Sequence, residues 1–267
     1  MRVLVTNDDG ITSPGLAALA VELAGRGHDV VVAAPLTDHS GASASLTVDL
    51  VGGIGLQQIA VEAMPGVVAF GVEGSPALSV LLARLGCFGD PPGAVVSGIN
   101  AGLNTGRGLL HSGTVGAALT ASNMGWPGIA VSLQGRFPTY WTTAAWAAGE
   151  ALDWVSRTRR RTLLTISVPD EPLAAVRGIR WAKIAAYGGT RLTMSGRDGK
   201  RVQVSEVAGA LPPDPQTDAG LVAAGFVAVT PLQGIVALPD PGVVAELDAA
   251  LTGRQTTDPV TLEPDPA

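Results

Sequence analysis

Two adjacent carboxylates, Asp8 and Asp9, lie near the start of the chain between an asparagine and a glycine. Neighbouring carboxylates repel one another, and a hard divalent cation such as Mg²⁺ or Mn²⁺ is a common reason for a protein to gather them. The same pair also occurs in ordinary turns, where both side chains are simply hydrated. The preceding residues have the pattern of a first β-strand, whose end is a frequent position for ligand-binding groups in α/β folds, so both interpretations stay open.

Two further polar segments carry groups suited to the same chemistry. Ser40 could offer a hydroxyl oxygen to a metal, and Gly41 beside it lets backbone amides approach a phosphate. Asn100 lies between Gly98 and Gly102 and provides a neutral amide oxygen. Both segments also have the composition of tight turns, so neither is specific by itself.

Ser112, Gly113 and Thr114 directly precede an expected helix over residues 115–124. A Ser or Thr at this position caps a helix, and the free N–H groups of the same helix start can bind a phosphate, so the two roles are compatible. His39 and His111 lie beside these segments. Either could give a proton to a leaving alkoxide, and we favour His111, although a single loop histidine is more often a plain surface residue.

Alternating strands and helices are expected to position these groups. We predict strands at residues 2–6, 28–35, 94–97, 128–133 and 162–168, and helices at residues 14–26, 115–124 and 139–158. The strands are continuous apolar runs, which indicates a parallel sheet covered by helices on both faces. Ligands bind beyond the carboxyl ends of such strands, where the polar segments fall. The sequence therefore predicts an α/β fold.

The pattern changes after residue 168. Predicted strands at residues 179–187 and 201–207 are separated by a polar stretch over residues 188–200, which indicates an extended arm or β-hairpin within residues 179–232. A hairpin cannot bury a core alone and often packs on another subunit, so we expect a homo-oligomer. A strand at residues 226–232 and a helix at residues 243–251 complete one domain over residues 1–251, and residues 252–267 are predicted to be a disordered tail.

Composition excludes several classes of protein. Of the 267 residues, 46% are hydrophobic and 15% charged, which suits a folded core rather than a disordered chain. The apolar runs are shorter than the ~20 residues that cross a bilayer, and no secretory signal is visible, so we expect a cytoplasmic protein without a membrane partner. Cys87 is the only cysteine, which excludes an intrachain disulfide, and a net charge of −6 argues against a nucleic-acid polymer as partner.

Six segments, taken in order, resemble the SurE family of survival proteins, which are divalent-metal-dependent 5'/3'-nucleotidases. They are residues 5–11, 40–47, 96–102, 112–115, 217–218 and 225–232. The resemblance implies a Rossmann-like three-layer sandwich with a mostly parallel sheet. It also implies that an extended arm and a C-terminal segment are exchanged between subunits of a homodimer or homotetramer.

The same resemblance implies roles for individual residues. One Mg²⁺ or Mn²⁺ would be held by oxygens from Asp8, Asp9, Ser40 and Asn100. Asp8 or Asp9 would also orient the attacking water. Backbone amides and polar side chains would bind the phosphate, at Asn7, Gly41, Ser112, Gly113 and Thr114.

The function implied is a metal-dependent phosphomonoesterase that hydrolyses nucleoside 5'- or 3'-monophosphates to the nucleoside and phosphate. The chain departs from the family pattern in two places. Residues 36–40 lack a familiar Asp and Arg, and Leu78 stands where the family has an aspartate. If that aspartate fixes the substrate, the protein is specialised for another small phosphate ester. The other alternative is a catalytically inactive ligand-binding homologue, although such a protein has no physical need to keep two repelling carboxylates.

Overall fold

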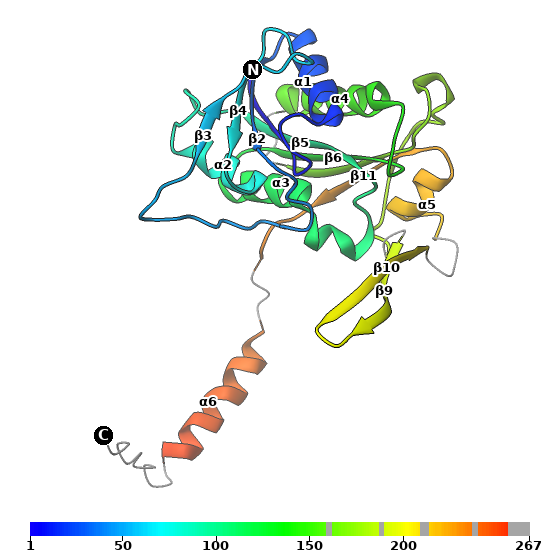
Figure 1. Ribbon diagram of the computed structural model, residues 1–267. Helices are drawn as coiled ribbons and strands as arrows, with labels where there is room; N and C mark the ends of the chain where they lie inside the picture. The colour runs from blue at the N-terminus through cyan, green and yellow to red at the C-terminus, as the bar shows by residue number, and fades with distance from the viewer. Residues whose placement is uncertain (159–161, 187–189, 209–213, 237–239, 256–267) are drawn as a thin grey trace. The chain divides into compact units, whose positions relative to one another are not determined.

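A nine-stranded sheet forms the centre of the fold in the computed structural model, which describes all residues except 159–161, 187–189, 209–213, 237–239 and 256–267 (Figure 1). Its strands are β1 (Arg2–Thr6), β2 (Asp29–Pro35), β3 (Leu56–Gln58), β4 (Val68–Val72), β5 (Ala94–Ala101), β6 (Gly128–Leu133), β7 (Leu163–Val168), β8 (Ile179–Trp181) and β11 (Val227–Leu232). They lie in the order β3-β4-β2-β1-β5-β6-β7-β11-β8. The six strands from β4 to β7 are parallel to one another, whereas β3 and β11 each join antiparallel to their inner neighbour.

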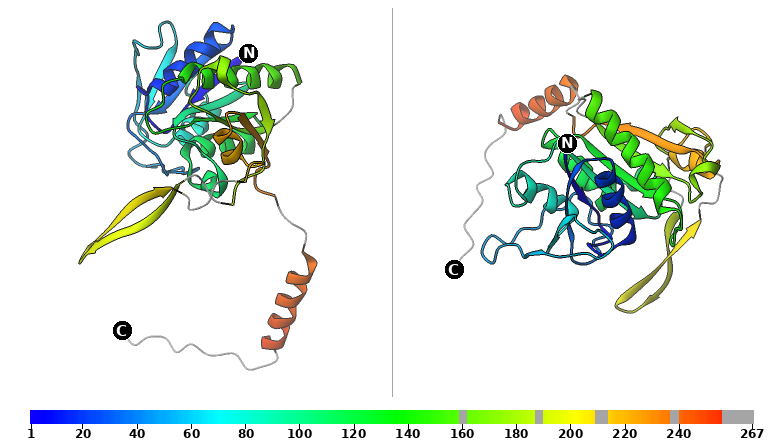
Figure 2. Two further views of the ribbon diagram at one scale, coloured as in Figure 1. Left: turned by 90° about the vertical axis from the view of Figure 1, so that its right-hand side faces the viewer. Right: turned by 90° about the horizontal axis from the view of Figure 1, so that it is seen from above.

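Helices cover both faces of this sheet, so the predicted three-layer α/β sandwich is confirmed. Helices α1 (Pro14–Gly25) and α4 (Trp141–Thr158) lie side by side over one face (Figure 2), and α2 (Pro76–Arg84) and α3 (Gly113–Asn123) cover the other. The strand pleat explains the two cores. Val3 and Val5 of β1 pack in the cluster that includes α1 and α4, and Leu4 between them packs with α2 and α3.

Polar caps mark where the helices begin. Ser13, Ser75, Ser112 and Thr217 each accept a hydrogen bond from the backbone N–H three residues later. These bonds satisfy one of the free donors at the start of α1, α2, α3 and the short helix α5 (Asp218–Ala223). Two 3-10 helices, η1 (Gly106–His111) and the single turn η2 (Leu173–Ala175), and the helix α6 (Pro241–Gln255) are the remaining described helices.

The arm differs from its predicted extent. Its hairpin consists of β9 (Thr190–Asp198) paired antiparallel with β10 (Arg201–Ala208), so the first strand lies where we expected a polar connection. The predicted strand over residues 179–187 ends at Trp181 as β8, and β8 and β11 belong to the main sheet. Only Leu192 and Met194 are apolar along β9, and its many polar residues together with Gly196 have the composition of a connection, which hid the strand. Its use in oligomerisation stays a prediction.

Two other boundaries shift. The sequence did not predict β3, β4 or α2, and it ended the strand of β5 at residue 97, whereas pairing with β6 resumes beyond a register shift at Asn100. The chain divides into a compact unit over Met1–Gly234 and a second unit over Ile235–Ala267. Within the second unit, α6 extends past the predicted helix end at residue 251, and the remainder of the predicted tail lies outside the described residues. The single domain over residues 1–251 stays a prediction.

Candidate active site

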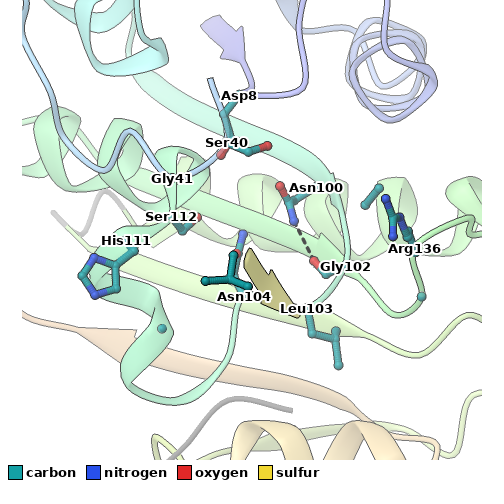
Figure 3. Close-up of a pocket in the computed structure, with 14 residues that line it drawn as sticks. Asp8, Ser40, Gly41, Asn100, Gly102, Leu103, Asn104, His111, Ser112 and Arg136 are labelled. Carbon is teal, nitrogen blue, oxygen red and sulfur yellow. Dashed lines mark hydrogen bonds between the residues drawn. The ribbon is translucent and has the colours of Figure 1, made fainter. Parts of the chain in front are cut away.

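The predicted functional segments meet at the carboxyl ends of β1, β2 and β5. They line an open cavity of about 1260 Å³ (Figure 3), to which Asp8, Ser40, Gly41, Asn100, His111 and Ser112 all contribute. Parallel strands end at the same edge of a sheet, so residues 8, 40 and 100 come together although they are distant in the chain.

Asp8 lies at the N-terminus of α3. Its carboxylate accepts a hydrogen bond from Thr114 Oγ1, and hydrogen bonds from the backbone of Gly113 and Thr114 also stabilise its ionised form. Burial nevertheless raises the pKa of Asp8, because the side chain is 2% exposed. Gly113 makes this contact possible, since a Cβ there would lie 2.8 Å from the Asp8 Cβ. The helix start that we predicted to bind phosphate therefore also binds Asp8.

Asp9 is half-buried and lines an adjacent cavity of about 550 Å³. Burial is the main cause that raises the pKa of Asp9 to about 6, and the negative charge of Asp8 adds to it. A hydrogen bond from the backbone of Ala101 acts in the opposite direction. None of the ion pairs between described residues involves Asp8 or Asp9. Neither carboxylate therefore has an ion-paired cation among the described residues.

The segment that carries Ser40 is fixed against α3 and the turn before it. Ser43 donates its hydroxyl to the Leu110 carbonyl at 2.7 Å and its backbone N–H to the His111 carbonyl at 3.3 Å. Gly116 on α3 allows this approach, because a Cβ there would be 2.2 Å from the Ser43 carbonyl oxygen. Ser40 itself is exposed at the cavity, and its N–H binds the Asp38 carboxylate at 2.7 Å. These contacts present Ser40 and Gly41 opposite the start of α3.

Asn100 has a defined orientation. Its Nδ2 donates to the Gly102 carbonyl at 2.7 Å, as the dashed line in Figure 3 marks, so its Oδ1 is the side-chain atom left for another ligand. Thr114 Oγ1 lies 3.4 Å from that oxygen and also binds Asp8. The Thr114 hydroxyl thereby links Asp8 and Asn100, two of the four predicted metal ligands, although they follow or belong to different strands.

The other predicted phosphate-binding residues have structural partners. Asn7 is fully buried and donates to Ser13 Oγ at 2.6 Å and to the Gly10 carbonyl at 3.2 Å, which holds the turn carrying Asp8 and Asp9. Its Oδ1 has no partner among the described residues. Ser112 Oγ accepts from Val115 N at 3.1 Å as a helix cap, and it also lines the cavity. Direct contact of these residues with phosphate stays a prediction.

The donor set suits a divalent cation. Among the described residues, no three His, Cys, Asp or Glu side chains gather as a metal site. The predicted set needs only two, because a hydroxyl and an amide supply the remaining oxygens, and Mg²⁺ and Mn²⁺ accept such mixed oxygen ligands with water. A buried and a half-buried carboxylate, both with raised pKa values and neither with a paired cation among the described residues, are the groups that a bound divalent ion would neutralise.

Sequence reasoning missed one charged residue at the site. Arg136 follows β6 and lies at the rim of the cavity (Figure 3), where it also lines the cavity beside Asp9. The predicted strand over residues 128–133 could have revealed it, because the loop after that strand begins at the carboxyl edge of the sheet, where the other site residues lie. Of the two histidines, His111 lines the larger cavity, and the backbone N–H of His39 binds the Asp8 carbonyl at 2.8 Å.

Leu78, the departure from the family pattern that suggested altered specificity, has an apolar side chain in an apolar environment. It is fully buried and packs in the apolar cluster that contains Leu4 of β1 and Ala117 of α3. It is a core residue of α2, so its side chain contributes packing rather than a polar contact.

The fold and the cavity together define a doubly wound α/β protein in which carboxylate, hydroxyl and amide oxygens line the carboxyl edge of the sheet. Within that class, the chain belongs to the SurE family: the model described as "Survival protein SurE" matches residues 3–189.

Similar proteins agree with this assignment. The chain is 37% identical to the 5'-nucleotidase SurE of Pseudomonas entomophila over 243 residues and 38% identical to that of Stutzerimonas stutzeri over 238 residues. Each alignment covers 87% of this chain and 92% of the relative. The crystal structure of the SurE protein from Aquifex aeolicus superimposes with a TM-score of 0.75 at 27% identity, covering 94% of this chain and all of the other. The fold therefore extends over the whole of that relative.

Proposed function

We propose that this chain is a divalent-metal-dependent phosphomonoesterase that hydrolyses nucleoside 5'- or 3'-monophosphates. The observation that carries the proposal is the desolvated and unpaired Asp8–Asp9 carboxylate pair beside the start of α3. Curated relatives over most of the chain are named 5'-nucleotidases, which supports the substrate class.

The cation site is formed by oxygens of Asp8, Asp9, Ser40 and Asn100, and either Mg²⁺ or Mn²⁺ suits this set. When bound, the cation supplies Lewis acidity toward the phosphoryl oxygens. Asp8 or Asp9 orients the attacking water through its carboxylate. The backbone N–H of Gly41 and the hydroxyl of Ser112 bind the phosphate oxygens, because Asp8 and Ser112 already accept from the backbone N–H groups of Gly113, Thr114 and Val115. The positive end of the α3 dipole still favours an anion there.

The leaving group needs a proton. The water oxygen forms a bond to phosphorus while the ester P–O bond breaks, and one water proton passes to the carboxylate that orients the water. The departing alkoxide takes up a proton from a general acid, which is then reprotonated from solvent. His111 lines the cavity, so we assign the donation of that proton to its imidazole. The products are the free alcohol, here a nucleoside, and inorganic phosphate.

Phosphate release from nucleoside 5'- and 3'-monophosphates, sugar phosphates and p-nitrophenyl phosphate tests this function, with Mg²⁺, Mn²⁺ or EDTA. We expect release that needs metal, that is best with nucleotides and that falls at least ~100-fold in Asp9→Asn. The control is Asp29→Asn, which removes an exposed carboxylate bound to Arg2 far along β2 from the site. Equal release by Asp9→Asn and wild type would contradict the proposal. A sugar phosphate as the best substrate would favour a specialised esterase, and no release from any ester a binding protein.

We also propose that the protein is cytoplasmic and assembles as a homodimer or homotetramer. No helix among the described residues is long and apolar enough to cross a membrane. Met194, Val202 and Val204 are exposed on the hairpin of β9 and β10, which as a two-stranded ribbon has little core of its own. Light scattering of the full chain measures the assembly, and a monomeric mass at micromolar concentration would contradict it.

A further inference from the structure

We propose that the loop between β6 and α4 forms the binding site for the nucleobase, with Phe137 as its stacking platform. The cavity beside Asp9 is lined by Phe137, Pro138 and Trp141 from this loop and the start of α4, and by Thr12, Ser13 and Pro14 at the start of α1. Its volume of about 550 Å³ lies within the range of small-ligand sites. This inference rests on the proposed function, since it assigns the part of the substrate that is not phosphate.

The position of this cavity suits a leaving group. It contains Asp9, whereas the larger cavity contains Asp8 and the start of α3, and the two share Ala101 and Arg136. A phosphate held at α3 would therefore leave the rest of a nucleotide directed past Asp9 into the smaller cavity.

The Phe137 ring is exposed to solvent and therefore free to contact a ligand. Its side chain is 86% exposed, and the Arg136 guanidinium lies 5.8 Å from the centre of its ring. A planar base can stack on a phenyl ring or on a guanidinium, whatever its sequence identity. Arg136 is the one permanently positive side chain among the described residues that line the two cavities, so it also attracts an anionic substrate to the acidic pair.

The loop is anchored on both sides, which fixes this platform before a ligand arrives. Gln134 N–H binds the Val168 carbonyl at 2.9 Å, and the Asp170 carboxylate accepts from Thr139 N at 2.9 Å and Tyr140 N at 2.8 Å. Only residues 135–138 project between these anchors. A short, anchored loop loses little conformational entropy on binding.

Trp141 forms a firm wall of the same cavity. Its ring packs against the start of α1, where a Cβ on Gly15 would come 2.6 Å from Trp141 Cζ3 and 2.1 Å from the Ile99 carbonyl oxygen. The glycine thus lets α1, β5 and α4 meet closely behind the cavity. The cavity is thus lined by a half-buried indole and an exposed phenyl ring, an arrangement suited to a flat aromatic ligand.

A kinetic comparison tests the assignment with the full chain. Adenosine 5'-monophosphate and ribose 5-phosphate carry the same phosphoryl group and sugar, and only the first has a base. We expect Phe137→Ala to lower kcat/KM for the nucleotide by roughly 5- to 30-fold, mainly through KM, while ribose 5-phosphate changes by less than about 2-fold. Phe137→Tyr keeps the ring and should restore the wild-type value. Leu85→Ala, which truncates an exposed side chain at the end of α2, is the control. Equal losses for both substrates would overturn the proposal.

Binding without catalysis separates this site from the proposed reaction. Saturation-transfer NMR titrations with adenosine or ribose, in EDTA, report the base subsite alone. We expect adenosine to bind wild type and Phe137→Tyr alike, and Phe137→Ala at least ~5-fold more weakly, with no binding of ribose. If no ester is hydrolysed but adenosine binding depends on Phe137, the subsite stands and the hydrolase does not. If Phe137→Ala changes only the oligomeric mass, the ring is a subunit contact and the subsite is overturned.

Discussion

Gly113 lies against Asp8 so closely that a Cβ on residue 113 would be 2.8 Å from both Cβ and Oδ2 of the aspartate. The start of α3 and the end of β1 therefore determine each other's position. Asp8 also accepts from Thr114 Oγ1, so displacement of either residue would change the orientation of the carboxylate.

Gly113→Ala should displace Asp8, because the added methyl overlaps its Cβ and Oδ2. We expect kcat/KM for a nucleotide to fall by about 100-fold, the loss typical of a displacement of about 1 Å at a catalytic group. The free energy of unfolding should fall by about 1–3 kcal/mol. Gly25→Ala is the matched control, since no atom lies within 4 Å of a Cβ at the end of α1. Unchanged kinetics in Gly113→Ala would show that Asp8 tolerates displacement.

The sequence predicted the central strands well because a strand that is buried on both faces is a continuous apolar run, which can be recognised without knowing the fold. Residues 2–6 and 128–133 form buried strands with the predicted limits, since each is a run of apolar residues covered on both faces. Strands β3 and β4 were missed for two other reasons. Residues of β3 are exposed, and β4 is interrupted by Gly71, which must be small because Leu36 Cδ2 would lie 2.3 Å from a Cβ there.

The site was predicted by residue type but not by role. That Asp8, Ser40 and Asn100 share one cavity follows from the rule that parallel strands end together. That Asn7 is buried as a turn support, and that Thr114 links Asp8 to Asn100, depends on side-chain directions that sequence spacing does not encode. The sequence did not indicate a role for Phe137, because an exposed aromatic residue in a loop suggests ligand binding only when a cavity is known to lie beside it.

Asp9→Asn should stabilise the metal-free protein at neutral pH. The pKa of Asp9 is raised from 3.8 to about 6 in the folded state, so between these values the folded protein binds more protons than the unfolded chain. The stability of wild type should therefore fall as pH rises through this window and stay lower above it. We expect a gain of about 1–2 kcal/mol for the variant at pH 7.5, because the neutral amide avoids the cost of burying a charge, and solvent already reduces that cost at the half-buried Asp9.

Thermal unfolding in EDTA at pH 4 and pH 7.5 measures this effect. The variant and wild type should have similar Tm values at pH 4, and the variant should unfold at higher temperature at pH 7.5. Asp29→Asn, at an exposed ion pair, should show no such gain at pH 7.5. Addition of Mg²⁺ should raise the Tm of wild type more than that of Asp9→Asn, because a ligand stabilises the state that binds it. The same Tm difference at both pH values would contradict the assignment of the raised pKa.

Leu78→Ala should change stability without changing substrate preference. Leu78 is fully buried between β1 and α3, so its truncation leaves a cavity, which costs about 2–5 kcal/mol. The ratio of kcat/KM for adenosine 5'-monophosphate to that for ribose 5-phosphate should stay within about 2-fold of wild type. Chemical denaturation and the two rates test this, with the exposed Leu85→Ala as control for truncation of a leucine. A change in this ratio of kcat/KM values, in a variant as stable as wild type, would show that residue 78 determines specificity.

Asp218 is expected to hold the turn that leads to helix α3. Its carboxylate is 3% exposed and accepts from Gly106 N at 2.7 Å, Ala219 N at 2.8 Å and Ala185 N at 3.1 Å. Gly106 begins η1, which ends at His111, so the carboxylate joins α5 to the residue assigned as proton donor. Asp218→Ala leaves these N–H groups without their acceptor and should destabilise the protein by about 2–4 kcal/mol.

The kinetics of Asp218 variants distinguish a local from a global effect. Asp218→Asn keeps one acceptor oxygen but turns an amide group toward one N–H donor, so it should retain more activity than Asp218→Ala measured well below its Tm. Since Gly106 loses its anchor in Asp218→Ala, we expect kcat to fall at least about 10-fold while the main sheet stays folded by circular dichroism. Asp198→Ala, at the exposed end of β9, is the control. Asp218 contacts the turn at Gly106 and acts on His111 only through that turn. Wild-type kcat in a folded Asp218→Ala would therefore show that the position of His111 does not depend on this carboxylate.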